Sequence, residues 1–260
     1  ASPVEARAMV LAAAPEWSDP DVWFAIRGAG EPVSPRNLLA ALDLRQGEQG
    51  IESVPADRAV LRPVLWRTLG VAASVTGICL LLGYPLAMLI ATAPPRAVPW
   101  LLGAVLLPFW TSLVVRTAAW WVMLQKEGLV NAVLGAAGLV GAPESLLFGR
   151  FAVLVATVHV LLPFMVLPIA ANLRAQDPRL LRAAAACGAG PARAFRRVTL
   201  PLSLPGVGAG CLLVFVQTLG FFVTPALLGG PGEQMLAWFV FFQASRLGDW
   251  GMAAALSVLL

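Results

Sequence analysis

Four long apolar runs constrain the fold of this chain more than any other feature. They cover about residues 66–91, 100–123, 151–171 and 203–228. Each run holds the roughly 20 residues that an α-helix needs to cross a bilayer. A fifth apolar run begins near Trp250 and reaches Leu260, and only 12% of the chain is charged, about half the share of a soluble domain. The sequence therefore predicts an all-α, polytopic membrane protein.

A strongly basic segment sets the predicted orientation. Residues 172–201 lie between the third and fourth runs and contain six arginines against one acid, Asp177. Short loops rich in arginine stay on the cytoplasmic side of a membrane, so this segment is predicted to be cytoplasmic. Alternation of the spans then places the turn at Arg96 inside and segments 125–150 and 229–249 outside, where positive charges are few.

Residues 1–63 differ in character from the rest. They are broken by prolines and contain neither a run that could cross a bilayer nor a signal-peptide pattern. Short helices are predicted at 4–14 and 36–45. Alternation makes 1–63 extracytoplasmic, so we expect this segment to follow a missing first span. The run at Trp250 is about eleven residues long and too short to cross. Residues 64–260 are therefore expected to form the permease transmembrane domain of a six-helix core whose first span is missing and whose last span is truncated.

The basic segment is predicted to form a hairpin of two helices. Alanine, leucine and arginine favour a helix over 179–187, and Gly188 suits the left-handed backbone that ends a helix. Pro191 favours the first position of a second, amphipathic helix, which is expected to stop at Leu200-Pro201. The alternative is an ordinary basic loop that contacts anionic lipid, although such a loop needs neither caps nor an alanine-rich face.

This hairpin resembles the EAA loop of type I ABC-importer permeases. The family motif is Glu-Ala-Ala, three residues, Gly, nine residues, and Ile-x-Leu-Pro, and the spacing in this chain is the same. The matching positions are Ala183, Ala184, Gly188, Val198, Leu200 and Pro201. Arg182 replaces the motif glutamate, which reverses the charge. The resemblance implies that the hairpin is a coupling loop that docks on a cytoplasmic ATPase.

Other motifs narrow the resemblance to the spermidine/putrescine branch of that family, over residues 64–260. They are Gly83-Tyr-Pro-Leu-Ala87, Leu107-Pro-Phe-Trp-Thr-Ser112, Leu161-Leu-Pro-Phe-Met165 and the run from Pro205 to Leu213. The resemblance implies a permease of the bacterial inner membrane that forms a path for polyamines and needs no cofactor. Permeases for opines, aminophosphonates or amino-acid-like solutes are similar to this branch, and such a permease is the alternative.

The resemblance also implies the partners. A second, homologous permease would complete the membrane domain, and two ABC ATPase subunits would dock beneath the hairpin. A periplasmic substrate-binding protein would contact the outer segments 125–148 and 229–248. Membrane lipid surrounds such a protein, and no nucleic-acid partner is expected, because the arginines lie mostly in one loop. The chain contains no P-loop motif, so we expect a transport subunit without an ATPase site.

The four complete apolar runs contain no acid, although a polyamine is a polycation. Aromatic faces and polar oxygen atoms can hold a cation weakly enough to release it, so we expect such groups to line the pathway. The candidates are Trp110, Thr111, Trp120, Gln217, Phe221, Phe222 and Thr224. The alternative for each of them is simple packing between helices.

Arg116 and His159 lie inside predicted spans, where ionisable groups suggest a function. Arg116 either forms part of an outer gate, paired with Glu127 or a partner subunit, or extends to the membrane interface. His159 is either a proton relay or, because no acid shares its span, a packed and hydrogen-bonded side chain. The chain lacks the motifs of nucleophilic or metal-dependent enzymes. An intramembrane enzyme and a non-transporting scaffold are therefore the weaker rivals.

Overall fold

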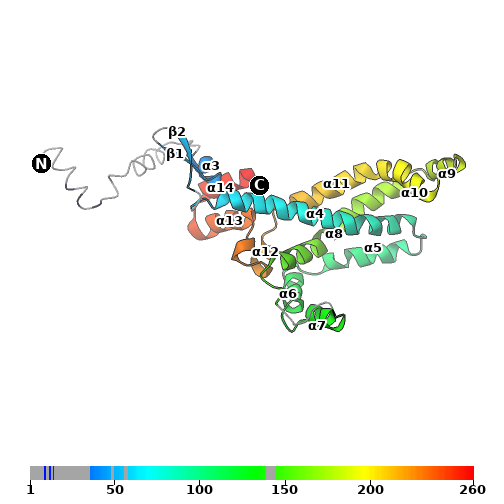
Figure 1. Cartoon of the computed structure of the whole chain (residues 1–260), viewed down its shortest axis with the longest axis horizontal. Helices are drawn as coiled ribbons and strands as arrows, with labels where there is room; N and C mark the ends of the chain where they lie inside the picture. Colours follow the sequence, from blue (N-terminus) through cyan, green and yellow to red (C-terminus); the bar gives the residue numbers. More distant parts are fainter. Residues whose placement is uncertain are drawn as a thin grey trace. The chain divides into compact units, whose positions relative to one another are not determined.

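The computed structural model describes residues 36–47, 50–55, 58–138 and 145–260, together with Met9, Ala12 and Ala14. The helix predicted at 4–14 lies almost wholly outside these residues. The chain divides into two compact units, one of Ala1–Trp66 with Phe239–Leu260 and one of Arg67–Trp238. In both units the described chain is mainly helical (Figure 1), which confirms the predicted fold class.

Three helices of the described chain are long and apolar enough to cross a membrane. They are α4 (Leu61–Thr92), α8 (Arg150–Ala175) and the continuous helix Pro191–Leu219. The last consists of α10 (Pro191–Ala194), a π-helical turn (Phe195–Thr199) and α11 (Leu200–Leu219). The first and third predicted spans are confirmed as helices, and each helix is a few residues longer than its apolar run.

Shorter elements connect these helices. They are α5 (Val98–Leu106), a 3₁₀ turn (Leu107–Trp110), α6 (Leu113–Met123), α7 (Leu129–Ala136), α9 (Pro178–Ala186), α12 (Val223–Leu228), a second 3₁₀ turn (Pro231–Glu233) and α13 (Leu236–Phe242). A π-helical turn (Gln243–Leu247) follows α13 directly.

α8 forms the centre of the larger unit. Leu161 and Met165 of α8 belong to one buried cluster with Val75 and Ile90 of α4 and Val214 of α11. Figure 1 shows α4, α5 and α11 running alongside α8. Because its neighbours cover most of its surface, α8 accommodates two internal prolines without ending. In lipid such prolines are tolerated where surrounding helices satisfy the freed backbone groups.

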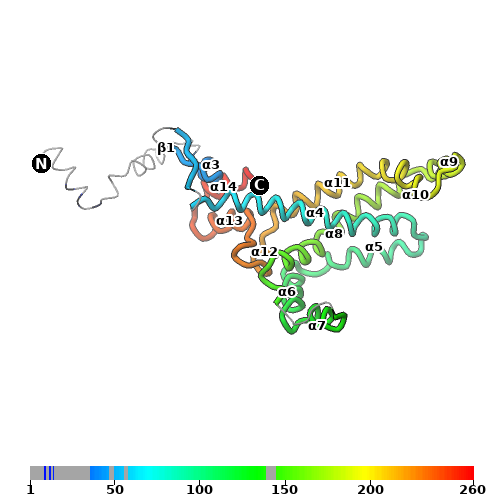
Figure 2. The backbone as a smooth tube through the Cα atoms, viewed as in Figure 1, coloured from blue at the N-terminus to red at the C-terminus, as the bar shows by residue number. Residues whose placement is uncertain are grey.

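The second predicted span is not one continuous helix. The helical pair Val98–Trp110 and Leu113–Met123 is bent by 93°, a turn that Figure 2 shows in the chain path between α5 and α6. Thr111 has the extended backbone angles φ −108° and ψ 149°, and Pro108 has no N–H to continue the helical hydrogen bonds. The helix thus tightens into a 3₁₀ turn at Pro108 and ends at Thr111 and Ser112, of which Ser112 has φ −59° and ψ 141°.

The fourth predicted span also ends early. α11 stops at Leu219, and α12 begins only at Val223. Pro225 has no N–H to donate to the carbonyl of Phe221, so a single helix cannot run through this point without losing a hydrogen bond. The sequence did not predict this break, because the residues stay apolar up to Leu228 and a hydrophobic pattern does not show that Pro225 lacks a backbone N–H.

The smaller unit contains α3 (Arg36–Ala41), strands β1 (Leu44–Gly47) and β2 (Gly50–Ser53), and α14 (Trp250–Leu259). The prediction of a helix over 36–45 was therefore wrong beyond Ala41. Asp43 takes a left-handed backbone with φ 55°, which turns the chain out of α3. The strands then form an antiparallel hairpin in which Arg45 lies 3.4 Å from Glu52.

Asp43 also caps the start of α4. Its carboxylate accepts hydrogen bonds from the backbone N–H groups of Val60, Leu61 and Arg62, at 3.3, 3.2 and 2.6 Å. The first N–H groups of a helix have no partner within it, and an aspartate satisfies them well. This explains why α4 begins before the apolar run does.

Two glycines let α11 approach α8 closely. A Cβ added at Gly206 would lie 2.6 Å from Cβ of Asn172 and 2.9 Å from the carbonyl oxygen of Pro168. A Cβ at Gly210 would lie 3.1 Å from the carbonyl oxygen of Met165. Small residues four positions apart are typical of helix pairs that pack closely in membranes. The α8–α11 contact therefore depends on the absence of side chains at Gly206 and Gly210.

We predict that Gly206→Ala destabilises the protein, because the added methyl group collides with the backbone of α8 and forces the helices apart. Overpacking of this kind costs about 1–3 kcal/mol. Gly208→Ala is the matched control, since it lies in the same helix with nothing within 4 Å of the added Cβ. Thermal unfolding of the detergent-purified protein measures the difference. Equal melting temperatures for the two variants would contradict the prediction.

Candidate functional site

The basic hairpin begins at a well-defined helix cap. The carboxylate of Asp177 accepts a hydrogen bond from the backbone N–H of Arg179 at 2.8 Å. Pro178 occupies the first position of α9, where its missing N–H is not needed. Asp177, the single acid of segment 172–201, is thus used to start α9 rather than to pair with an arginine of the hairpin.

Gly188 ends α9, as the sequence predicted. It has φ 76°, and the backbone N–H of Ala189 donates to the carbonyl of Ala184 at 3.0 Å while that of Gly188 donates to Ala185 at 3.0 Å. These two bonds define a Schellman motif, which favours glycine at the left-handed position. The turn between the two helices of the hairpin is therefore fixed by local hydrogen bonds.

The second helix of the hairpin begins at Pro191 as predicted, but it does not stop at Leu200-Pro201. It runs on into α11 through the π-helical turn, in which the N–H of Leu200 donates to the carbonyl of Phe195. Pro201 has no N–H to offer to the preceding turn. The chain accommodates this by widening one turn, which is how π turns commonly arise within α-helices. The hairpin and the following span are thus one helix.

The base of the hairpin is attached to α4. The rings of Tyr84 and Phe195 meet edge to face with centroids 6.0 Å apart. The hydroxyl of Tyr84 lies 3.0 Å from that of Ser203, which is fully buried. Ala194 and Thr199 are also buried. One side of the second helix therefore packs on the unit, and its other side is left exposed.

α9 is exposed along most of its length. Leu180 and Leu181 are 46% and 43% exposed, and Arg182 and Ala183 are exposed beside them. Exposed leucines on a projecting helix are typical of a surface that a partner covers. Of the other motif positions, Ala184 and Val198 are half-buried, and Gly188, Leu200 and Pro201 are exposed.

Five of the seven predicted pathway residues lie at or near the two helix breaks. Trp110 and Thr111 precede the turn into α6, and Trp110 is 89% exposed on this chain. Gln217 lies in the last turn of α11 and is exposed, whereas Phe221 and Phe222 between α11 and α12 are half-buried. Carbonyl groups at the ends of α5 and α11 are left without the helical partners that a continuous helix would provide.

The other two predicted pathway residues make internal hydrogen bonds. Thr224 is fully buried, and its hydroxyl lies 3.3 Å from that of Thr117 in α6. The indole N–H of Trp120 donates to Nδ1 of His159 at 3.1 Å. His159 thereby has the packed, hydrogen-bonded position that is the alternative to a proton relay. These contacts hold α12 and α8 against α6.

Arg116 is half-buried in α6, and its Nε atom has no hydrogen-bond partner among the described residues. The structure shows no ion pair between Arg116 and Glu127, which is exposed. The predicted pairing within this chain is therefore not observed.

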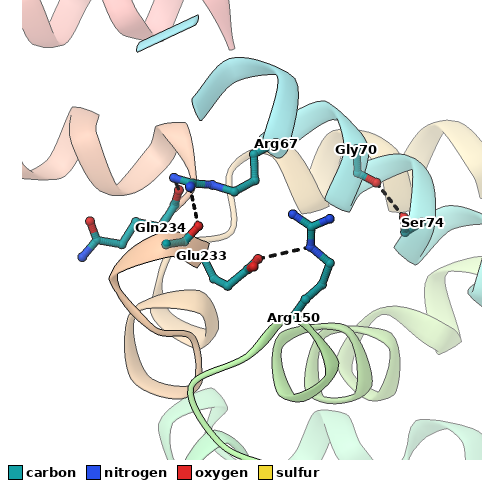
Figure 3. A network of polar contacts seen from close by, with 7 residues as sticks. Arg67, Gly70, Ser74, Arg150, Glu233 and Gln234 are labelled. Carbon is teal, nitrogen blue, oxygen red and sulfur yellow. Dashed lines mark hydrogen bonds and ion pairs between the residues drawn. The ribbon is translucent and has the colours of Figure 1, made fainter. Parts of the chain in front are cut away.

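A polar network without any sequence signal binds segment 229–236 to α4 and α8 (Figure 3). The Arg67 guanidinium donates to the backbone carbonyls of Gly232 and Gln234. Nε of Arg150 lies 3.3 Å from a carboxylate oxygen of Glu233. These residues are far apart in the chain, and arginines at the ends of apolar runs are otherwise ordinary interface residues.

Backbone contacts reinforce this network. The N–H of Leu236 donates to the hydroxyl of Thr68 at 2.9 Å. The N–H of Phe148 donates to the carbonyl of Leu228 at 2.8 Å. The network lies near the start of α4, whereas Tyr84 attaches the hairpin to the later half of the same helix. The two attachment points are therefore well separated along α4.

We predict that Glu233→Gln loosens segment 229–236 by removing its ion pair with Arg150. The two side chains are 18% and 56% exposed, so the pair contributes at most about 1 kcal/mol. Hydrogen exchange of the Glu233 and Leu236 amides should quicken by up to about fivefold. Glu52→Gln removes the comparable Arg45–Glu52 pair of the smaller unit and serves as the control. Unchanged exchange in Glu233→Gln would contradict the prediction.

Comparisons with known proteins agree with the predicted resemblance. Residues 71–260 match the family of the binding-protein-dependent transport system inner membrane component. The spermidine/putrescine transport system permease protein PotB of Haemophilus influenzae is 37% identical over 195 residues, which cover 75% of this chain and 68% of PotB. PotB of Escherichia coli K12 is 36% identical over 197 residues, with 76% and 72% covered. The molybdenum transport system permease protein ModB of Mycobacterium bovis is 35% identical, with 73% and 70% covered.

Solved structures show the same fold. A bacterial ABC transporter involved in the import of the acidic polysaccharide alginate has a chain with a TM-score of 0.60 at 18% identity, covering 97% of this chain and 88% of that one. The MetNI methionine ABC transporter in an inward-facing conformation matches with a TM-score of 0.57 at 17% identity, with 75% and 85% covered. With the family match over most of its length, this chain belongs to the binding-protein-dependent transport system inner membrane components, and it is a multi-pass protein of the bacterial inner membrane.

Proposed function

We propose that this chain is the transmembrane permease subunit of a bacterial ABC importer and forms the translocation path for polyamines such as spermidine and putrescine. The observation that carries the proposal is the projecting hairpin of α9 and α10, with capped ends and exposed leucines, on a chain 36–37% identical to PotB. Such a hairpin gives a partner ATPase a surface through which to move α11. The absence of a P-loop motif from the sequence supports an energy source in that partner.

The proposed complex contains this permease, a second homologous permease, two ABC ATPase subunits and a periplasmic substrate-binding protein. The ATPases dock on residues 178–199 at the cytoplasmic side, and the binding protein contacts 125–148 and 229–248 at the other side. Closure of the ATPases moves the hairpins and alternates access to the path. The continuity of α10 with α11 supports this coupling, because movement of the hairpin is passed directly to a spanning helix.

Arg182 is expected to meet an acidic residue on the ATPase. It is exposed on α9 at the position of the motif glutamate, and it makes no ion pair within the described residues. The one acid of the hairpin, Asp177, is engaged as a helix cap. An acidic residue on the ATPase would keep the contact with Arg182 favourable, because opposite charges that face each other across an interface attract and like charges repel.

The ends of broken helices explain how a span without acids can hold a polycation. The C-terminal end of an α-helix carries roughly half a negative charge, and carbonyls at such ends coordinate cations in other transporters. α5 with its 3₁₀ turn ends at Trp110, and α11 ends at Leu219. Together with the aromatic faces of Trp110, Phe221 and Phe222, these carbonyls form weak cation sites. Arg116, close by in α6, acts in this proposal as a gate that limits cation escape.

A second candidate is a permease for an oxyanion or another small solute. ModB, a molybdenum transport permease, is 35% identical to this chain over 192 residues. The half-buried Arg116, whose Nε atom is unpartnered in the described structure, suits an anion better than a cation. Opines, aminophosphonates and amino-acid-like solutes remain in the same group of alternatives.

Uptake of labelled putrescine and spermidine tests the proposal. We expect ATP-dependent uptake when the permease is expressed with its partner subunits in a strain that lacks polyamine uptake, and none when the ATPase is inactivated. Molybdate, an opine and an aminophosphonate are tested in parallel. Uptake of one of these without polyamine uptake would favour the second candidate, and no transport by an assembled complex would contradict both.

Arg182→Glu tests the coupling loop. If an ATPase acid faces Arg182, the variant places two negative charges together and should reduce ATPase co-purification and uptake, by roughly tenfold for a repulsion of about 1–2 kcal/mol. Arg174→Glu, with the same charge change just before α9, is the control. Improved uptake in Arg182→Glu would show instead that the natural loop is impaired by its arginine.

Trp110→Ala and Phe222→Ala test the pathway. Removal of a cation–π partner should raise the KM for spermidine about two- to fivefold, since exposed cation–π contacts contribute about 0.5–1 kcal/mol. Val114→Ala, which removes another exposed apolar side chain near the first break, is the control. Unchanged uptake kinetics at normal expression would exclude Trp110 and Phe222 from the pathway.

A further inference from the structure

Three arginines of the hairpin line a single surface cavity. Arg193, Arg196 and Arg197, with Ala192, surround a volume of about 380 Å³. The arginines are spaced by three and one residues, which places them on one side of a helix. All three are exposed, so their guanidinium groups are accessible to a ligand from outside the chain.

The positive charge of this arginine pocket is not balanced within the described residues. None of the three guanidinium groups makes an ion pair there. The carboxylate of Asp177, the one acid of the hairpin, accepts a hydrogen bond from the backbone N–H of Arg179 as the cap of α9. Three like charges repel one another across a small pocket, so the pocket is suited to a ligand that carries concentrated negative charge.

The position of the pocket points to the membrane. The helix continues from the arginines through α11 to Leu219, long enough to cross the hydrocarbon core of about 30 Å. Leu200 and Leu204, in the first turns after the pocket, are 36% and 58% exposed. A cluster of cationic side chains is thus followed directly by exposed apolar side chains. A phospholipid has the matching order, with a charged headgroup followed by apolar acyl chains.

We propose that the arginine pocket binds the phosphate group of an anionic phospholipid from the leaflet that borders the hairpin. Arginine forms bidentate, charge-assisted hydrogen bonds with phosphate oxygens, and basic pockets at the ends of membrane helices recognise anionic headgroups. The acyl chains lie along Leu200 and Leu204. A free phosphate ion would satisfy the charge but would gain nothing from these leucines. The pocket arginines lie within the segment 178–199 on which the ATPase is proposed to dock, so the ATPase is the competing occupant, and the experiment below separates the two.

Lipid titration of the purified transporter complex tests the site. The complex is stripped of lipid and titrated with phosphatidylglycerol, phosphatidylcholine or inorganic phosphate, and bound molecules are counted by native mass spectrometry. The test variant is R193Q/R196Q/R197Q. The matched control is R96Q/R174Q/R179Q, which removes the same charge from arginines that are exposed on the same predicted side and do not line the pocket.

We expect phosphatidylglycerol to bind the unaltered complex in preference to phosphatidylcholine. The pocket variant loses its bidentate contacts with the phosphate and should bind roughly 100-fold more weakly, whereas the control, whose arginines do not line the pocket, should stay within about threefold. Arg196→Lys keeps the charge but loses the bidentate geometry, and should fall between the two. This single substitution also keeps the test decisive if the triple variant does not assemble.

Several outcomes would overturn the proposal. Equal losses in the two triple variants would mean general attraction of lipid to a basic loop. Equal binding of the two lipids, or inorganic phosphate that binds as tightly as phosphatidylglycerol, would exclude an anionic lipid site. Loss of the ATPase from the pocket variant with unchanged lipid binding would assign the arginines to ATPase docking. Because the readout does not involve uptake, failure of this proposal and failure of the proposed function are distinguishable.

Discussion

The close contact of α11 with α8 is the constraint on which the rest of the larger unit depends. Lipid tails are as apolar as leucine, so helices in a bilayer gain little from burying apolar surface and must associate through close packing. Gly206 and Gly210 provide it by letting α11 lie against the backbone of α8. That contact fixes the line of α11, and the line of α11 determines where the basic hairpin lies at one end and where the break at Leu219 lies at the other.

The hydrogen bonds of α4 in the larger unit fall into two groups, one near each end of that helix. Near the hairpin, Tyr84 joins α4 to the second hairpin helix and to Ser203. Toward the start of α4, Arg67 and Thr68 bind the segment that follows α12. α4 is therefore attached to both ends of the polypeptide path through α11 and α12. The two helix breaks, after Trp110 and after Leu219, carry the exposed Trp110 and the half-buried Phe221 and Phe222.

The sequence predicted what is local and missed what joins distant residues. Apolar runs located α4 and α8, and single residues such as Gly188 and Pro191 located the hairpin turn, because each acts within one turn of helix. Pro108 and Pro225 were visible in the sequence, but whether a proline bends or breaks a membrane helix depends on its neighbours. The cap formed by Asp43 and the contacts of Arg67 and Glu233 join positions that no periodicity relates, so they emerged only from the structure.

The continuity of the hairpin with the spanning helix has a mechanical consequence. Pro191–Leu219 is a rod of 29 residues, about 44 Å long at 1.5 Å per residue. A tilt of about 5° around its midpoint, where the glycines touch α8, displaces each end by about 2 Å in opposite directions. The helix then tilts about the point where Gly206 and Gly210 contact α8. A push on the hairpin at one end of the helix moves Gln217, near the other end, in the opposite direction without any change inside the helix.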